Sequence, residues 1–104
     1  MFAIVSECCP TGCAIQVFLV RSRRDGRIYS YCWACGVMWR HPLAARWESG
    51  LDEEFIDPRT HLPDAFDLPS DDQIAANGFS GFVIRTSDCE YCARYFESEL
   101  HGHL

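Results

Sequence analysis

The first forty residues alternate between apolar segments and turn residues in a pattern that predicts β-strands. Residues 14–21 are rich in β-branched and aromatic side chains, and the turn cluster that follows them ends in Asp25-Gly26, a dipeptide typical of β-hairpins. Residues 27–31 then return as a second strand, and residues 36–40 form a third. The pattern therefore predicts a hairpin followed by one more strand.

Residues 41–78 have a different pattern, in which acidic and apolar side chains are interleaved and prolines recur. Residues 43–49 are good helix formers, and Ser70–Gln73 has the spacing of a capping box before a second short helix over residues 74–77. Three prolines exclude a long helix between these two segments: Pro58, Pro63 and Pro69. We expect an irregular acidic segment that is held in place by apolar side chains.

The last part of the chain returns to regular patterns. Residues 79–86 are typical of a strand, and the capping-box spacing of residues 87–90 opens a final helix that runs to about residue 100. The sequence thus predicts a single α+β domain over residues 1–104. No apolar run is long enough to span a membrane, and no secretory signal precedes the first strand. We therefore expect a cytoplasmic protein.

Two cysteine pairs flank the predicted hairpin. Cys9 and Cys13 precede its first strand, while Cys32 and Cys35 follow its second strand. A hairpin returns the chain to its starting end, so both pairs can direct their sulfurs toward one point about 2.3 Å from each, as a four-thiolate zinc site requires. Cys8 is adjacent to Cys9 and is an alternative ligand.

This arrangement resembles the three-stranded, four-cysteine zinc ribbon over residues 8–40, where Cys32, Cys35 and Gly36 fit the knuckle pattern best. A reducing cytosol favours metal over a disulfide framework or unmetallated core cysteines. The resemblance implies a structural Zn²⁺ ion with four cysteine ligands. Such a site has no open coordination position, so we expect no enzymatic activity at the metal.

A third pair, Cys89 and Cys92, lies on the apolar face of the predicted C-terminal helix and has three interpretations. The two thiols can pack in the core as small hydrophobic groups. They can act in thiol redox chemistry, because a helix N-terminus lowers a thiol pKa. They can also form a second metal site together with His101 and His103.

Charge divides the chain, which contains no lysine and has a net charge of -6. Residues 1–47 contain six arginines and two acids, which gives +4, whereas residues 48–78 contain nine acids and one arginine, which gives -8. Such a layout suits electrostatic steering of a charged partner, although the acids can also simply maintain solubility.

Two binding functions follow from this division. In the first, the acidic segment binds a basic protein, as in a small inhibitor or immunity protein that blocks a nuclease-like toxin. The residues expected to bind this partner are Trp47, Asp52, Glu53, Glu54, Phe55, Asp57, Asp64 and Phe66. The alternative is a nucleic-acid-binding zinc ribbon that contacts phosphates through the turn of the hairpin. Its candidate residues are Arg21, Arg23, Arg24 and Arg27. A thiol redox protein that uses Cys89 and Cys92 is the second alternative.

Overall fold

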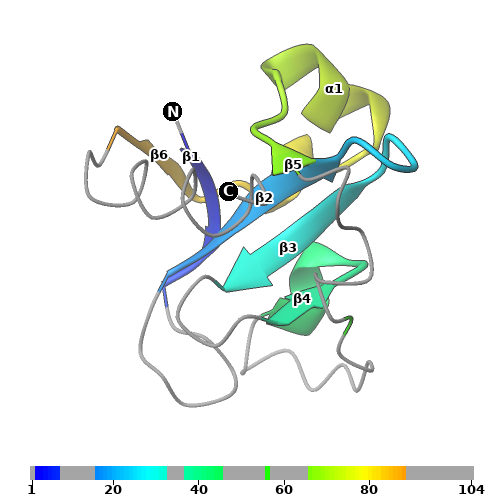
Figure 1. Ribbon diagram of the computed structural model, residues 1–104. Helices are drawn as coiled ribbons and strands as arrows, with labels where there is room; N and C mark the ends of the chain where they lie inside the picture. The colour runs from blue at the N-terminus through cyan, green and yellow to red at the C-terminus, as the bar shows by residue number, and fades with distance from the viewer. Residues whose placement is uncertain (1, 8–15, 33–36, 46–55, 57–65, 89–104) are drawn as a thin grey trace.

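An antiparallel sheet dominates the structure, a computed structural model that describes residues 2–7, 16–32, 37–45, 56 and 66–88 (Figure 1). The strands are β1 (Phe2–Ser6), β2 (Val17–Ser22), β3 (Ile28–Cys32), β4 (Val37–Trp39), β5 (Phe66–Asp67) and β6 (Arg85–Ser87). Their order in the sheet is β4-β3-β2-β1-β6, and β5 pairs with β2. The described helical elements are α1 (Asp71–Ala76) and two 3-10 helices, η1 (Pro42–Ala45) and η4 (Ser80–Phe82).

The hairpin of β2 and β3 forms the centre of the sheet, as the sequence predicts. Phe18 pairs with Tyr31, and Arg21 pairs with Ile28. Between them, Gly26 has a φ of 72°, a left-handed conformation that glycine adopts without steric cost. β4 then pairs with β3, so the predicted third strand is confirmed.

β1 is the strand that our sequence analysis did not predict, although it lies between β2 and β6 in the sheet. Phe2, Ile4 and Val5 are each 3% exposed or less. A strand buried on both faces is a continuous apolar run rather than an alternating pattern, so its periodicity does not identify it. The N-terminal residues therefore contribute to the core.

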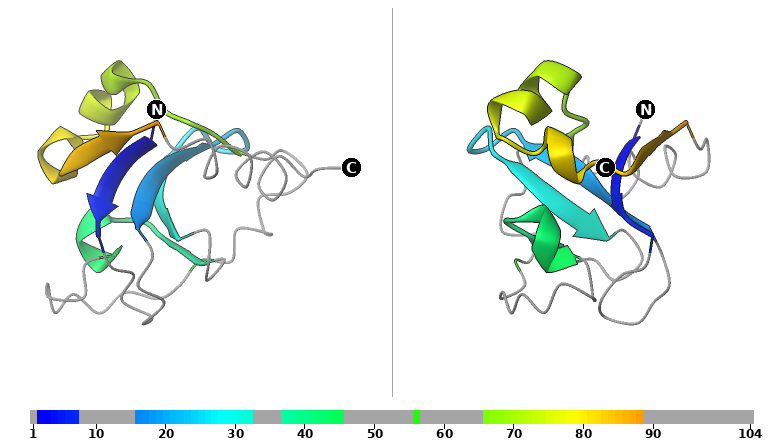
Figure 2. Two further views of the ribbon diagram at one scale, coloured as in Figure 1. Left: turned by 90° about the vertical axis from the view of Figure 1, so that its left-hand side faces the viewer. Right: turned by 180° about the vertical axis from the view of Figure 1, so that it is seen from behind.

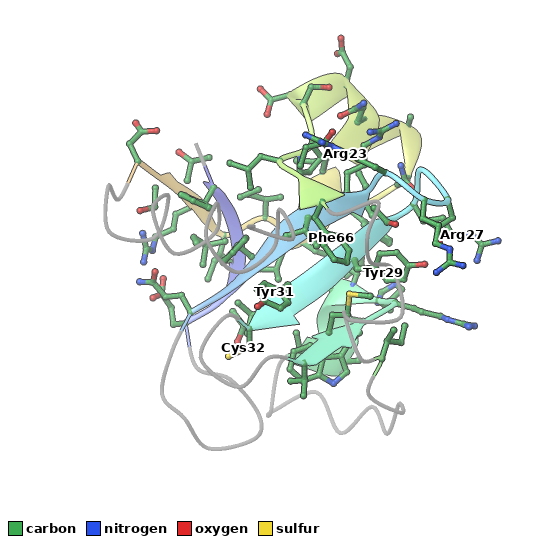
Figure 3. The ribbon with its side chains drawn as sticks, viewed as in Figure 1. Arg23, Arg27, Tyr29, Tyr31, Cys32 and Phe66 are labelled. Carbon is green, nitrogen blue, oxygen red and sulfur yellow. The ribbon has the colours of Figure 1, made fainter. Side chains whose placement is uncertain are left out.

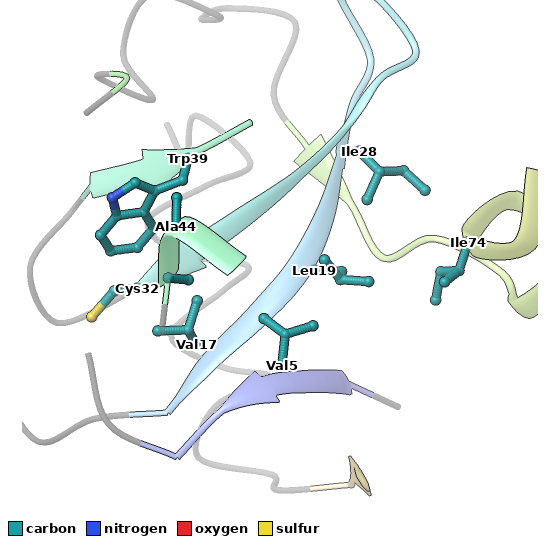
Figure 4. Close-up of a cluster of buried hydrophobic side chains, with 9 residues drawn as sticks. Val5, Val17, Leu19, Ile28, Cys32, Trp39, Ala44 and Ile74 are labelled. Carbon is teal, nitrogen blue, oxygen red and sulfur yellow. The ribbon is translucent and has the colours of Figure 1, made fainter. Parts of the chain in front are cut away.

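Successive residues of the central strands point to opposite faces of the sheet, and both faces are buried. One face is aromatic, and Phe18 makes edge-to-face contacts there with Phe2 and Tyr31 at ring-centroid distances of 4.8 and 5.7 Å. The second face is more aliphatic, and α1, η1 and η4 all lie against it (Figures 2 and 4). Its fully or nearly fully buried side chains are Val5, Val17, Leu19, Ile28, Cys32, Trp39, Ala44, Ala45 and Ile74.

The capping box predicted at residue 70 is confirmed. The Ser70 hydroxyl accepts a hydrogen bond from the Gln73 backbone N–H at 3.2 Å, and the Gln73 side chain accepts one from the Ser70 backbone N–H at 2.8 Å. These bonds satisfy two donors at the beginning of α1. Ile74 then packs against the aliphatic face, which attaches this short helix to the sheet.

The strand expected over residues 79–86 is correct only near its end, because Ser80–Phe82 form η4 and pairing begins at Arg85. The reason is tertiary packing: the ring of His41 contacts both Phe79 and Phe82, at centroid distances of 5.6 and 5.0 Å. His41 also accepts a hydrogen bond from the Leu43 N–H through Nδ1, at 3.1 Å. This bond opens η1, the described part of the helix expected at residues 43–49.

The other predicted elements lie outside the described residues. They are the C-terminal helix, most of the acidic segment, and the segments that contain Cys8, Cys9, Cys13 and Cys35. Of the first two cysteine pairs, Cys32 alone is described. The described part is a small domain in which the sheet dominates and one short α-helix is present.

Candidate functional site

The described candidate residues lie mainly at the two ends of the β2–β3 hairpin. We call the end that contains Cys32 the cysteine end and the end that contains Gly26 the turn end. At the cysteine end, β1 and β2 pair with Ser6 opposite Val17, after a register shift between Ile4 and Ser6. The Gln16 side chain donates a 3.5 Å hydrogen bond to Glu7. Cys32 is the last residue of β3 and is opposite Val37. The ends of four neighbouring segments therefore meet at this end of the sheet, where Figure 3 shows Cys32.

Cys32 is the one predicted metal ligand that the structure describes. It is completely buried, in the same cluster as Val17 and Trp39 (Figure 4). The described residues contain no group of three metal-ligating side chains. The remaining candidate ligands lie outside them, namely Cys8, Cys9, Cys13, Cys35, Cys89, Cys92, His101 and His103. The two residues of the thiol redox alternative, Cys89 and Cys92, are among them.

An exposed ion pair also lies near the cysteine end. Arg85 in β6 donates through Nε to Glu7 Oε1 at 2.5 Å and through Nη2 to Glu7 Oε2 at 3.3 Å. The hydrogen bond from Arg85 lowers the pKa of Glu7 below its ordinary value, and the bond to Glu7 raises the pKa of Arg85. These residues are 78 positions apart in the sequence, so no local pattern predicts their contact.

The second region is the turn end, where hydrogen bonds close the hairpin. The Gly26 N–H donates to the Ser22 carbonyl at 2.8 Å, and the Ser22 N–H donates to the Arg27 carbonyl at 2.9 Å. The Asp25 carboxylate accepts from the Arg27 N–H at 2.8 Å and from the Tyr29 hydroxyl at 2.5 Å. Burial and the Asp25 carboxylate raise the pKa of Tyr29 to about 12.

The four arginines proposed to contact phosphate divide into two pairs at this end. Arg21 and Arg23 both approach Asp67 Oδ2, at 3.2 and 3.6 Å. Arg24 and Arg27 are exposed in the turn (Figure 3 labels Arg23 and Arg27). Asp67 belongs to β5 and to the acidic segment, so this segment neutralises part of the arginine cluster within the molecule.

Phe66 requires a correction to the proposed partner-binding set. It is 0% exposed and belongs to the aromatic face of the core, because β5 pairs with the end of β2. An apolar residue among acids can anchor a segment to its own core as well as to a partner, and here it does the former. The other candidates lie outside the described residues: Trp47, Asp52, Glu53, Glu54, Phe55, Asp57 and Asp64.

The described acids that face solvent in this segment are those of α1. Asp71 and Asp72 occupy the first turn of the helix, and both are exposed. No ion-pair partner for either carboxylate is present in the described part of the chain. These two side chains therefore present negative charge to solvent, in contrast to Asp67.

Comparisons with known proteins do not assign the chain to a family. No protein-family model matches it, and neither the curated proteins nor the solved structures contain a significant match. Among the described helices, none combines the length and the apolar character needed to cross a membrane.

Proposed function

We propose that this chain is a zinc-stabilised protein–protein interaction module that binds a basic protein through its acidic segment. An inhibitor or immunity protein that blocks a nuclease-like toxin has this character. The observation that supports the choice is the unequal use of charge: Asp67 forms ion pairs with Arg21 and Arg23 within the molecule, whereas Asp71 and Asp72 remain exposed. One acid of the segment is thus used within the molecule, while the two acids of α1 are presented to solvent, where a basic partner can reach them.

The proposed metal centre has Cys9, Cys13, Cys32 and Cys35 as ligands, with Cys8 as the alternative to Cys9. Its support is the meeting of strand ends at one end of the sheet. Cys9 is two residues after Glu7, and Cys35 is two residues before Val37. One extended residue spans about 3.3–3.6 Å, so each cysteine is within a short reach of the strand end beside Cys32.

Four thiolates complete a tetrahedral zinc site and leave no position for water or substrate. When bound, the metal would link the chain segment between β1 and β2 to the segment between β3 and β4. The thiol of Cys32 has a suitable environment for this role, because it is excluded from water at the end of a rigid hairpin. We assign the centre to stability and the acidic surface to binding.

Long-range attraction is the reason that an acidic surface is effective against a nucleic-acid-binding protein. Carboxylates imitate phosphates, and complementary charge raises the association rate and makes it sensitive to salt. The acidic segment has a net charge of -8 over residues 48–78. By contrast, an overall charge of -6 opposes binding of the chain to a phosphate backbone.

Charge-reversal variants test this function. The probes are a fluorescently labelled lysine-rich peptide and a labelled DNA duplex, each titrated with the zinc-loaded protein while anisotropy is measured over a series of salt concentrations. We expect the peptide to bind and its affinity to fall with salt. Replacing Asp52, Glu53 and Glu54 together by lysine should abolish peptide binding.

The matched control reverses the same number of charges at the turn end, with Arg23, Arg24 and Arg27 replaced by glutamate. We expect this variant to bind the peptide at least as tightly as the original chain. Tight binding of the duplex that is lost in the arginine variant would contradict the proposal and support the nucleic-acid alternative. No salt-dependent binding of the peptide would also contradict it.

A further inference from the structure

A pocket of about 240 Å³ lies on the aliphatic face where α1 and η4 meet the β1–β6 edge of the sheet. Figure 2 shows these four elements beside one another. The pocket is separate from both ends of the β2–β3 hairpin. Its lining residues are Ala3, Asp71, Ile74, Ser80, Val83 and Thr86.

The lining combines an apolar surface with a small number of polar groups. Ala3, Ile74 and Val83 supply aliphatic carbon, and each of them also packs against the buried cluster of this face. Ser80 and Thr86 are the hydroxyl-bearing residues of the same lining. Sites for drug-sized ligands or cofactors usually occupy about 300–1,000 Å³. This pocket is smaller, and its size suits one long side chain.

Asp71 gives the pocket its charge. Its carboxylate has no hydrogen-bond or ion-pair partner among the described residues, and Asp72 adds a second negative charge in the same helical turn. The N-terminus of a helix has the equivalent of about half a positive charge, so two carboxylates outweigh it. A cation is therefore favoured at the rim of the pocket.

We propose that this pocket binds a lysine side chain of the basic partner, an inference that rests on the proposed function. The aliphatic stem would cover Ala3 and Val83, while the ammonium group would donate hydrogen bonds to Asp71. Lysine has three donors and no acceptor, which matches a carboxylate with two neighbouring hydroxyls. The inference adds a specific contact to an otherwise long-range electrostatic attraction.

Ile84 is an exposed apolar residue that follows the lining residue Val83 in the chain. It is 49% exposed, and no other large hydrophobic residue is exposed in the described part of the chain. Its backbone N–H donates to the Ile4 carbonyl at 2.8 Å, so its position is fixed by the sheet. A partner residue next to the lysine in sequence can contact this side chain.

Nuclear magnetic resonance tests the pocket with short peptides in a glycine-serine background that contain one lysine, one arginine or one norleucine. We expect the lysine peptide to cause saturable shifts of the Ala3, Val83 and Thr86 backbone amides in zinc-loaded protein. Norleucine has the same stem without the charge, and its peptide should cause much smaller shifts.

Two isosteric variants separate the pocket from general attraction. Asp71→Asn should weaken lysine-peptide binding about threefold to fivefold, the size expected for one exposed ion pair. Asp72→Asn removes the same charge from the same turn but lies outside the pocket lining, so its effect should stay within about twofold. Unchanged amide shifts elsewhere would show that both variants remain folded.

Several outcomes would overturn the assignment. Equal losses for the two variants, stronger binding of the arginine peptide, or shifts that avoid the three amides would each overturn the lysine pocket. None of these outcomes contradicts the acidic binding function, because that function is tested by the lysine-rich peptide and by the charge reversal at residues 52–54. Conversely, saturable shifts at the pocket without salt-dependent binding of the lysine-rich peptide would overturn the proposed function, while the pocket would remain assigned as a lysine-binding site.

Discussion

The two ends of the β2–β3 hairpin are stabilised by different means. At the turn end, the chain is held by the backbone hydrogen bonds of Ser22 with Gly26 and Arg27, by the Asp25 carboxylate and by the ion pairs to Asp67. At the cysteine end, β3 stops at a buried cysteine in an apolar cluster, and the connections that leave the sheet contain the other cysteines of the predicted site.

The difference lies in the contacts that the described residues supply at each end. A turn that satisfies its own donors and acceptors needs nothing from outside the polypeptide. A strand end that presents thiols gains little from cysteine packing alone, because a thiol is a small hydrophobic group with weak hydrogen bonds. We infer that zinc stabilises the cysteine end as the Asp25 network stabilises the turn end.

Zinc removal gives the largest expected effect on this comparison. Structural zinc contributes on the order of 10 kcal/mol, and small domains have a free energy of unfolding of about 5–15 kcal/mol in total. We therefore expect a strong chelator to abolish cooperative thermal unfolding, monitored by circular dichroism. Cys32→Ala should lose zinc, measured by native mass spectrometry, and should unfold in the same way as the chelated protein.

Cys89→Ser is the matched control, because it changes a cysteine of the third pair. Under the four-cysteine assignment it keeps one zinc ion and a cooperative transition. A chain that purifies without zinc would contradict the comparison. So would a Cys32→Ala variant that keeps its metal and loses only about 1–2 kcal/mol, the cost of a small cavity in the core.

Several elements of the fold were predictable from sequence for physical reasons. Asp25-Gly26 specifies its turn through the positive φ that Gly26 adopts, and Ser70 specifies the start of α1 through a bond to a residue three positions away. Both signals are local. The strand assignments for β2 and β3 also rest on local β-branched and aromatic residues, so sequence patterns identify them.

The missed features depend on contacts between distant residues. Phe66 lies among acids in the sequence, yet its strand pairs with β2, and only this pairing decides that the side chain is in the core. The same holds for the neutralisation of Arg21 by Asp67, 46 positions away. The pocket likewise joins α1 to the β1–β6 edge, and no sequence spacing indicates that these elements meet.

The turn end is tested by removing its central carboxylate. Asp25→Ala loses the acceptor for both the Arg27 N–H and the part-buried Tyr29 hydroxyl. We expect a loss of about 2 kcal/mol, which lowers the melting temperature by about 10 °C in a domain of this size. The zinc content should not change. Loss of zinc in this variant would show that the two ends are not independent.

The titration of Tyr29 measures the same network by a different property. Its pKa is raised from 10.0 to about 12, mainly by burial and then by the bond to Asp25. The neutral phenol is favoured in the folded state, so its stabilising contribution is complete below pH 10 and is lost between pH 10 and 12. The Tyr29 titration is obtained by subtracting the ultraviolet pH titration of Tyr29→Phe from that of the original chain, and this difference should show the raised pKa. In Asp25→Asn the pKa should move back toward 10.0.

The smallest effect is expected from the Glu7–Arg85 pair, which is exposed although it lies near the cysteine end. Solvent screens exposed ion pairs, so Arg85→Gln should lower the free energy of unfolding only slightly, and by less at high salt. The lowered pKa of Glu7 means that the contribution is present above its ordinary value of 4.5 and is lost as pH falls through the folded-state pKa.

A double-mutant cycle with Glu7→Gln isolates this pair from other effects of the substitutions. Chemical denaturation at neutral pH should give two single variants with similar losses and a double variant that loses little more than either one. The coupling should disappear once Glu7 is protonated in acid. A coupling as large as that of the Asp25 network would mean that polar contacts stabilise both ends alike, and the contrast between them would then rest on the metal alone.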